Sequence, residues 1–214
     1  MEQANGGIRR KGTSARAYWL KTLHSWHWIS AAISLVVLLL FSVTGFTLNH
    51  AAQIQSEPLV VSRHLQLPVA LQEQLATRSD ASAASLPQEL KIWLQKESGV
   101  RLVAQPIEWS DGEAYVSLPR PGGDGWISID TASGKVEHET TDRGWIAYFN
   151  DLHKGRNTGA AWSWIIDLFA LACVLFALTG LGLLYLHGRH RPMTWPLVAL
   201  GLVLPVLIAL VFIH

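Results

Sequence analysis

The chain has a single cysteine, Cys173, and no CxxCH segment. A single cysteine excludes a disulfide framework, and the lack of a CxxCH segment excludes covalent attachment of a c-type haem. A glycine-rich fingerprint for a nicotinamide or flavin dinucleotide is also missing. Charged residues make up only 15% of the 214 residues, whereas apolar residues reach 50% and the mean hydropathy is +0.23. This composition excludes an ordinary soluble domain, and with a net charge of +1 we expect no nucleic-acid partner.

The apolar residues are gathered in three blocks, at residues 28–48, 162–186 and 195–213. A helix needs about 20 apolar residues to cross the hydrocarbon core of a bilayer. Each block therefore predicts a transmembrane helix. We place these helices at residues 18–50, 162–190 and 193–214, and we expect residues 1–17 to form a flexible cytoplasmic tail.

Basic residues are concentrated on one side of these blocks. Five of them precede Trp26 against one acidic residue, and Arg189 and Arg191 separate the second block from the third. In residues 51–161, acidic residues outnumber basic ones. By the positive-inside rule we expect the N-terminus in the cytoplasm, and the long loop and the C-terminus outside it.

Residues 51–143 differ from the blocks in having charged residues, Pro and Gly turns, and alternating apolar positions. They predict a small extracytoplasmic α+β domain, with a helix at residues 86–98 and strands at residues 101–109, 113–118, 125–130 and 135–140. His64 and His138 belong to this domain, and we expect both at its surface. Residues 144–161 contain several aromatic side chains and predict a segment along the membrane interface. The predicted fold class is an α-helical membrane protein with three transmembrane helices and one small α+β domain.

Histidines bracket the first two predicted helices at both membrane faces. On the cytoplasmic side they are His24, His27, His187 and His190, and on the other side they are His50 and His153. Two imidazoles that face each other from neighbouring helices are what bis-histidine ligation of b-type haem requires. Zinc would need a third protein ligand, which only the cytoplasmic cluster could supply. A preference of histidine for the boundary between apolar and wet surroundings is the simpler alternative.

Within the cytoplasmic cluster we prefer His27 and His187 as ligands, because they lie nearer the hydrocarbon, and keep His24 and His190 in reserve. Asp167 is the only acidic residue of the second block. A carboxylate at such a depth is costly and indicates a partner. It could accept a hydrogen bond from a ligating histidine, pair with Asn49 or a basic residue, or simply join two helices by a hydrogen bond.

One short motif occurs in both of the first two helices, which are predicted to run in opposite directions. Leu40-Phe41-Ser42-Val43-Thr44-Gly45 matches Leu175-Phe176-Ala177-Leu178-Thr179-Gly180. The match indicates a weak inverted repeat. Thr and Gly let helices approach closely in lipid, so a helix–helix contact is enough to explain the motif.

These residues resemble the PepSY-associated transmembrane family. The resemblance rests on His27-Trp28 opening the first helix, Thr44-Gly45 and Asn49-His50 closing it, Asp151-Leu152-His153-Lys154-Gly155 before the second helix, and Thr179-Gly180 near that helix's end. Residues 129–136 are similar to the strand-turn-strand ending of a PepSY domain. Larger members of the family are inner-membrane reductases of ferric siderophores that hold haem between helices.

The resemblance implies one or two b haems, with His27, His50 and His153 as iron ligands, and His187 then takes the remaining place by geometry. It also implies a bacterial inner-membrane protein that takes electrons from a quinol or a protein donor and passes them to an extracytoplasmic ferric chelate, which would make it a haem-dependent ferric reductase. The chain is shorter than those reductases, with three spans. The alternative is a non-enzymatic PepSY module in the bilayer that serves as an accessory or regulatory subunit of a respiratory or transport complex.

Overall fold

The computed structural model describes residues 8–54, 57–76, 86–102, 105–188 and 191–213. The chain divides into two compact units. One consists of residues 1–40 and 165–214, and the other of residues 41–164. The predicted ligand His190 lies outside the described residues.

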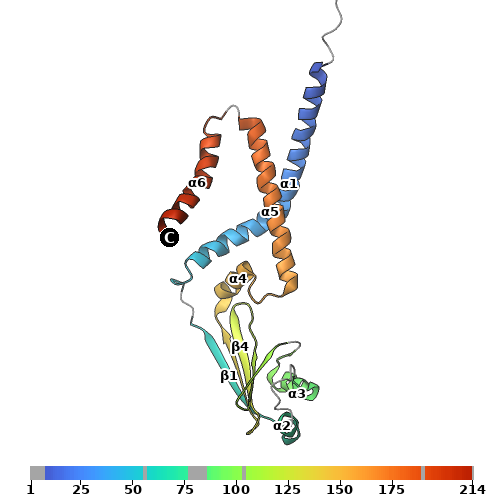
Figure 1. Cartoon of the computed structure of the whole chain (residues 1–214), viewed down its shortest axis with the longest axis vertical. Coiled ribbons are helices and arrows are strands. Elements are labelled where there is room, and N and C mark those ends of the chain that lie inside the picture. The colour runs from blue at the N-terminus through green and yellow to red at the C-terminus, as the bar shows by residue number, and fades with distance from the viewer. Residues whose placement is uncertain (1–7, 55–56, 77–85, 103–104, 189–190, 214) are drawn as a thin grey trace, which may run out of the picture. The chain divides into compact units, whose positions relative to one another are not determined.

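Three long helices carry the apolar blocks: α1 (Ile8–Asn49), α5 (Ala160–His187) and α6 (Thr194–Phe212) (Figure 1). All three are long and apolar enough to cross a membrane, so the three predicted long apolar helices are present. The helix α1 begins at Ile8, and residues 8–17, predicted as a flexible tail, are therefore helical. The physical reason is that Arg, Lys and Ala are good helix formers that extend the helix of the first apolar block, and the single Gly12 does not end it.

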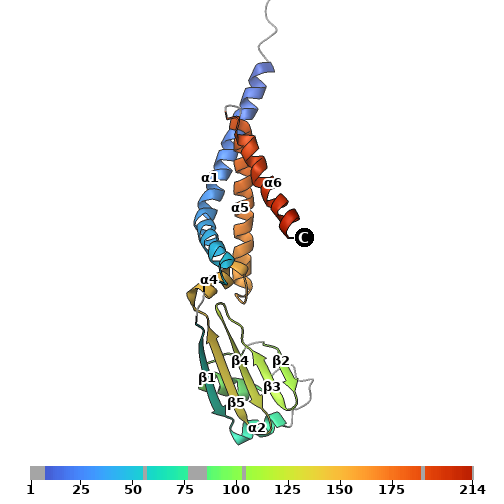
Figure 2. The ribbon, with the colours of Figure 1, turned by 90° about the vertical axis from the view of Figure 1, so that its left-hand side faces the viewer.

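The second unit contains a five-stranded antiparallel sheet with the order β1-β5-β4-β3-β2 (Figure 2). The strands are β1 (Leu59–Gln66), β2 (Ile107–Ser110), β3 (Glu113–Ser117), β4 (Gly123–Asp130) and β5 (Lys135–Asp142). Two helices, α2 (Val69–Ala76) and α3 (Gln88–Ser98), supply leucines to the same core as the sheet. Alternate residues of β3 and β4 are buried, as expected for a sheet with one covered face.

The predicted helix before Gly99 and three of the predicted strands are confirmed, with small shifts at their ends. The strand predicted from residue 101 begins only at Ile107, because Pro106 has no N–H to give to the sheet. The strand β1 and the helix α2 were not predicted from the sequence. In β1, both Val60 and Val61 remain exposed, so this strand lacks the alternation by which a half-buried strand is recognised.

The core of the sheet unit is built from residues of one continuous stretch of the sequence. Its fully buried members run from Leu67 to Val136 and come from the sheet, α2, α3 and the segments that connect them. We therefore expect residues 59–142, expressed alone, to be soluble and to show a mixed α/β circular dichroism spectrum with a cooperative thermal transition. An aggregated or disordered product would show that the sheet depends on the helices for stability.

His138 lies on the covered face of β5 and is only 5% exposed, so the prediction that it lies at the surface was wrong. The alternation of β5 puts residues 136 and 138 on one face, and among the described residues neither ring nitrogen of His138 has a hydrogen-bond partner. Burial, and then the charge of Arg63 on the paired strand, lower the pKa of His138 below its usual value.

This lowered pKa predicts that the domain loses stability in mild acid. The unfolded state takes up the proton first, so folding stability is full above the ordinary histidine pKa near 6.5 and falls as the pH drops towards the lower folded value. We expect the urea midpoint of the isolated domain to fall between pH 7.5 and 5.5, and His138→Leu to flatten that dependence. Arg63→Gln should weaken it partly. An equal slope in His138→Leu would assign the acid sensitivity to another group.

Candidate functional site

His27 of α1 lies against α5. Its ring stacks on Phe176 with 4.6 Å between centroids, and its Nδ1 is 3.2 Å from the Phe176 carbonyl oxygen and 3.1 Å from Thr179 Oγ1. A Cβ added to Gly180 would stand 3.3 Å from His27 Cε1, tighter than ordinary van der Waals contact. We call Phe176, Thr179 and Gly180 the His27 notch, because these three residues receive this one imidazole.

His153 belongs to α4 (Gly144–Lys154) and lies against the last turns of α1. Its ring centroid is 4.5 Å from that of Phe41, and its Nδ1 is 2.6 Å from Thr44 Oγ1. A Cβ added to Gly45 would meet His153 Cε1 at 3.7 Å. Phe41, Thr44 and Gly45 therefore form a second notch of the same composition, the His153 notch.

The two notches explain the repeated sequence motif. In both copies of Phe-x-x-Thr-Gly, the threonine is buried and contacts an imidazole Nδ1, the glycine leaves space for the ring, and the phenylalanine lies against it. The histidine always comes from outside the helix that carries the motif. The sequence indicated the motif and the histidines separately, but it gave no sign that each motif receives a histidine.

The other membrane-flanking histidines also use Nδ1. In His24, His50 and His187, Nδ1 is 3.0 Å from the carbonyl oxygen four residues earlier in the same helix. A carbonyl oxygen can only accept, so Nδ1 carries the proton and donates. In a neutral imidazole this leaves Nε2 with its lone pair, which is the form that binds a metal.

The structure brings some of the predicted ligands together and leaves others apart. The rings of His24 and His187 face each other with centroids 5.9 Å apart, so the contact that His187 makes is to the reserve residue His24. His27 is engaged with its notch. Among the described residues, no hydrogen bond or ring contact joins His50 to His153, and the His50 ring lies against Phe46 at 4.4 Å.

Asp167 is exposed on α5, and the described residues offer it no hydrogen-bond or ion-pair partner. The carboxylate with a clear structural role is Asp151, which the sequence analysis used only as part of a motif. Its side chain is buried, accepts from the Gly122 backbone N–H at 2.9 Å, and pairs with Arg156 at 2.9 Å. Asp151 thus ties α4 to the turn before β4, two residues from His153.

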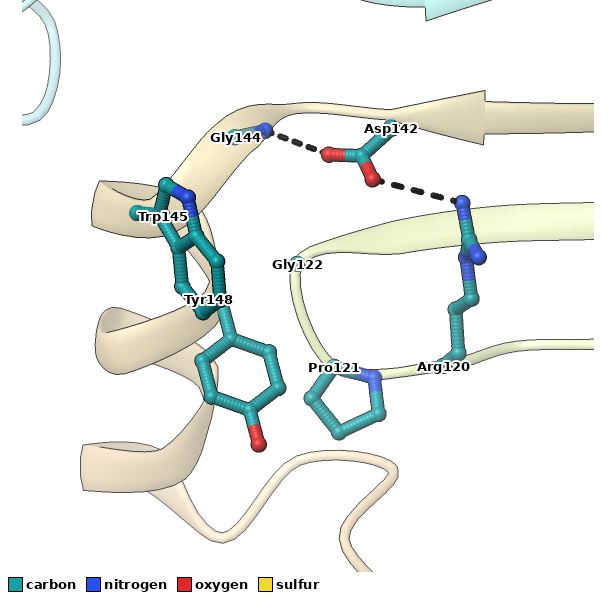
Figure 3. Close-up of a pocket in the computed structure, with 7 residues that line it drawn as sticks. All are labelled: Arg120, Pro121, Gly122, Asp142, Gly144, Trp145 and Tyr148. Atoms are coloured by element: carbon teal, nitrogen blue, oxygen red, sulfur yellow. Dashed lines mark hydrogen bonds and ion pairs between the residues drawn. The ribbon is translucent and has the colours of Figure 1, made fainter.

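Two pockets border the histidine-bearing segments. One, of about 480 Å³, lies between α4 and the turn before β4, with Trp145 and Tyr148 on the helix and Arg120 paired with Asp142 (Figure 3). The other, of about 470 Å³, is lined by Arg16, Tyr185, Trp195 and the two neighbours of His187. Each pocket therefore adjoins a segment that presents a histidine.

The donor set weighs against a simple metal-ion site. In the part of the chain that the structure describes, no three His, Cys, Asp or Glu side chains converge closely enough to hold a metal ion. Structural zinc requires four protein ligands, and catalytic zinc commonly three. The described residues thus provide no zinc site, whereas each notch holds a single imidazole whose Nδ1 faces a threonine hydroxyl.

The fold and the site define a helical membrane protein that carries one small antiparallel sheet domain and receives histidines in Thr-Gly notches between its helical segments. The chain belongs to the PepSY_TM-like family, whose model matches residues 18–214. This confirms the resemblance inferred from the motifs. No curated protein and no solved structure matches the chain.

Proposed function

We propose that the protein is a b-type haem electron carrier of the membrane, passing electrons to an extracytoplasmic acceptor such as chelated ferric iron. The observation that supports this most directly is the hydrogen-bonding pattern that the imidazoles share. All five described membrane-flanking histidines engage Nδ1 with an oxygen, which favours a bare Nε2. Hydrogen bonds from the second ring nitrogen to an oxygen orient metal-ligating histidines in proteins generally.

The imidazoles at the helix ends would supply the ligands of two b haems. The rings of His24 and His187 are nearly perpendicular, with 5.9 Å between their centroids. That contact puts His187 beside the stretch of α1 that carries His24 and His27. We assign His27 and His187 to one haem and His50 and His153 to the other.

We keep His24 as the reserve ligand because the two notches correspond to each other. His27 corresponds to His153, since both occupy a Thr-Gly notch. Three residues before each of them stand His24 and Asn150, and Asn150 accepts a hydrogen bond from Thr47 at 2.7 Å. We therefore prefer His27, which occupies a notch as His153 does, as the ligand. The position three residues earlier is a histidine only at the first notch.

Haem b, when bound, supplies a one-electron carrier within the membrane. The chain contributes the imidazoles, the apolar helices that surround them, and the two pockets. We place the acceptor in the α4 pocket, because Tyr148 lines it and lies five residues before His153, about 7.5 Å along a helix. The donor, a quinol or a protein, is placed at the pocket beside His187.

We further propose that the sheet domain lies outside the cytoplasm of a bacterium, on the side opposite the basic N-terminus. A reporter fused after Gly123 should therefore be active only if it works outside the cytoplasm. A cytoplasmic reporter that is active at the same position would reverse this orientation. A fusion after Lys21 should give the opposite result in the same cells and serves as the control.

The purified full chain, produced in cells supplied with haem precursors, tests the proposed function. We expect a dithionite-reduced minus oxidised spectrum of low-spin b haem, and a pyridine haemochrome count of two haems per chain. A colourless protein under these conditions would contradict the haem assignment. The accessory-subunit alternative would then stand, and co-purification of another membrane protein would support it.

A further inference from the structure

The two threonines in the notches have two hydrogen-bonding tasks at once. Thr179 Oγ1 is 2.6 Å from the Leu175 carbonyl oxygen of its own helix and 3.1 Å from His27 Nδ1. Thr44 Oγ1 is 3.2 Å from the Phe41 carbonyl oxygen and 2.6 Å from His153 Nδ1. In each case one hydroxyl links its own helix backbone to an imidazole that comes from elsewhere in the chain.

The donors of these hydrogen bonds can be inferred from the groups that can only accept. A hydroxyl has one proton, and helical threonine commonly donates it to the carbonyl three or four residues earlier. In that arrangement its lone pairs remain for the imidazole, and histidine Nδ1–H is the donor. At His27 the Phe176 carbonyl, 3.2 Å from Nδ1, enforces the same direction because a carbonyl cannot donate.

We infer that Thr44 and Thr179 are positioning residues that hold His153 and His27 in the tautomer with Nδ1 protonated and Nε2 bare. At Gly180 a Cβ would crowd His27 Cε1 at 3.3 Å, whereas at Gly45 it would stand in ordinary contact with His153 Cε1 at 3.7 Å. The consequence for haem rests on the proposed function. The tautomer itself does not, and can be measured without haem.

The two notches should respond differently to the same change. Thr→Val keeps the shape of the side chain but removes the acceptor. In Thr44→Val, His153 loses its only recorded Nδ1 partner among the described residues, whereas in Thr179→Val the Phe176 carbonyl still accepts from His27. We therefore expect a larger effect at Thr44 than at Thr179.

The first measurement is the ¹⁵N spectrum of the haem-free full chain, labelled at histidine and held in lipid nanodiscs. His27→Ala and His153→Ala identify the two sets of signals. In the wild type both histidines should show a protonated Nδ1 and a bare Nε2. Thr44→Val should mix the tautomers of His153, and Thr44→Ser should restore the wild-type pattern. A protonated Nε2 in the wild type, or an unchanged His153 tautomer in Thr44→Val, would overturn the inference.

The second measurement is titration of the same preparations with haemin. Loss of an outer partner commonly weakens a metal site about 10- to 100-fold, and we expect a loss of this size at one of the two sites in Thr44→Val and a smaller one in Thr179→Val. Thr44→Ser should bind as the wild type does. The control is Ser34→Ala, which removes a buried hydroxyl of α1 that donates to the Ser30 carbonyl of its own helix.

The ¹⁵N spectra and the haemin titration distinguish the role of the threonines from the proposed function. Wild-type protein that binds no haemin contradicts the proposed function, while the ¹⁵N spectra still decide the role of the threonines. Haem binding that is equally tight in Thr44→Val and wild type contradicts the positioning role even if haem is present. If Thr44→Val fails to fold, Thr44→Ser and Thr179→Val still report whether a hydroxyl at the notch controls the tautomer.

Discussion

His153→Ala should remove one of the two low-spin haems and leave the other intact. The imidazole is held at Thr44 and Phe41 by contacts that no other described histidine makes, so no neighbour can replace it. A bis-imidazole site that loses one ligand becomes five-coordinate or empties. The pyridine haemochrome count should fall from two to about one per chain, and the remaining spectrum should stay low-spin.

His27→Ala gives the matching result at the other site, with one difference. His24 lies one turn away and already contacts His187, so it offers a replacement ligand and partial occupancy is expected. The double variant His24→Ala/His27→Ala should therefore empty this site. His64→Ala is the control, because His64 is exposed in the sheet domain and pairs with Glu137. Unchanged low-spin spectra in both His153→Ala and the double variant would refute the ligand assignment.

Gly180→Leu should have the second largest effect, because it fills the space that the His27 ring occupies. Even a Cβ at this position would come to 3.3 Å from Cε1, so a leucine cannot fit unless the imidazole leaves its notch. Overpacking of this kind costs about 1–3 kcal/mol, and it separates α1 from α5 at their contact. We expect loss of the haem at His27, a lower thermal midpoint and a smaller yield of monodisperse protein.

The matched control is Gly201→Leu on α6. A Cβ at Gly201 meets no described atom within 4 Å, so the same substitution in a helix of similar composition should be tolerated. Gly180→Ala should fall between the two, since a shift of a few tenths of an ångström relieves the contact. Equal behaviour of Gly180→Leu and Gly201→Leu would show that the His27 notch does not hold the helices together.

The sheet domain shows where local patterns suffice and where they do not. The helix before Gly99 and the strands β3 to β5 follow from apolar alternation and turn residues, which are properties of neighbouring residues in sequence. The edge strand β1 is different, because it is defined by its pairing with β5, whose residues lie 69 to 83 positions further along the chain. His138 was misplaced for a related reason: burial depends on which face the rest of the fold covers.

The sequence alone determined that this is a membrane protein with three apolar helices and one small sheet domain, since span length and composition are set by the solvent that the helices meet. It also marked both Thr-Gly motifs and the histidines near the helix ends. Only the tertiary structure decided that His27 and His153 occupy those motifs, that His187 meets His24, and that Asp151 has the structural role while Asp167 has no described partner. The physical reason is that a hydrogen bond between residues more than 100 positions apart depends on how helices cross. Helix crossing in lipid is set by the packing of small residues from both helices, and one helix's sequence does not name its partner.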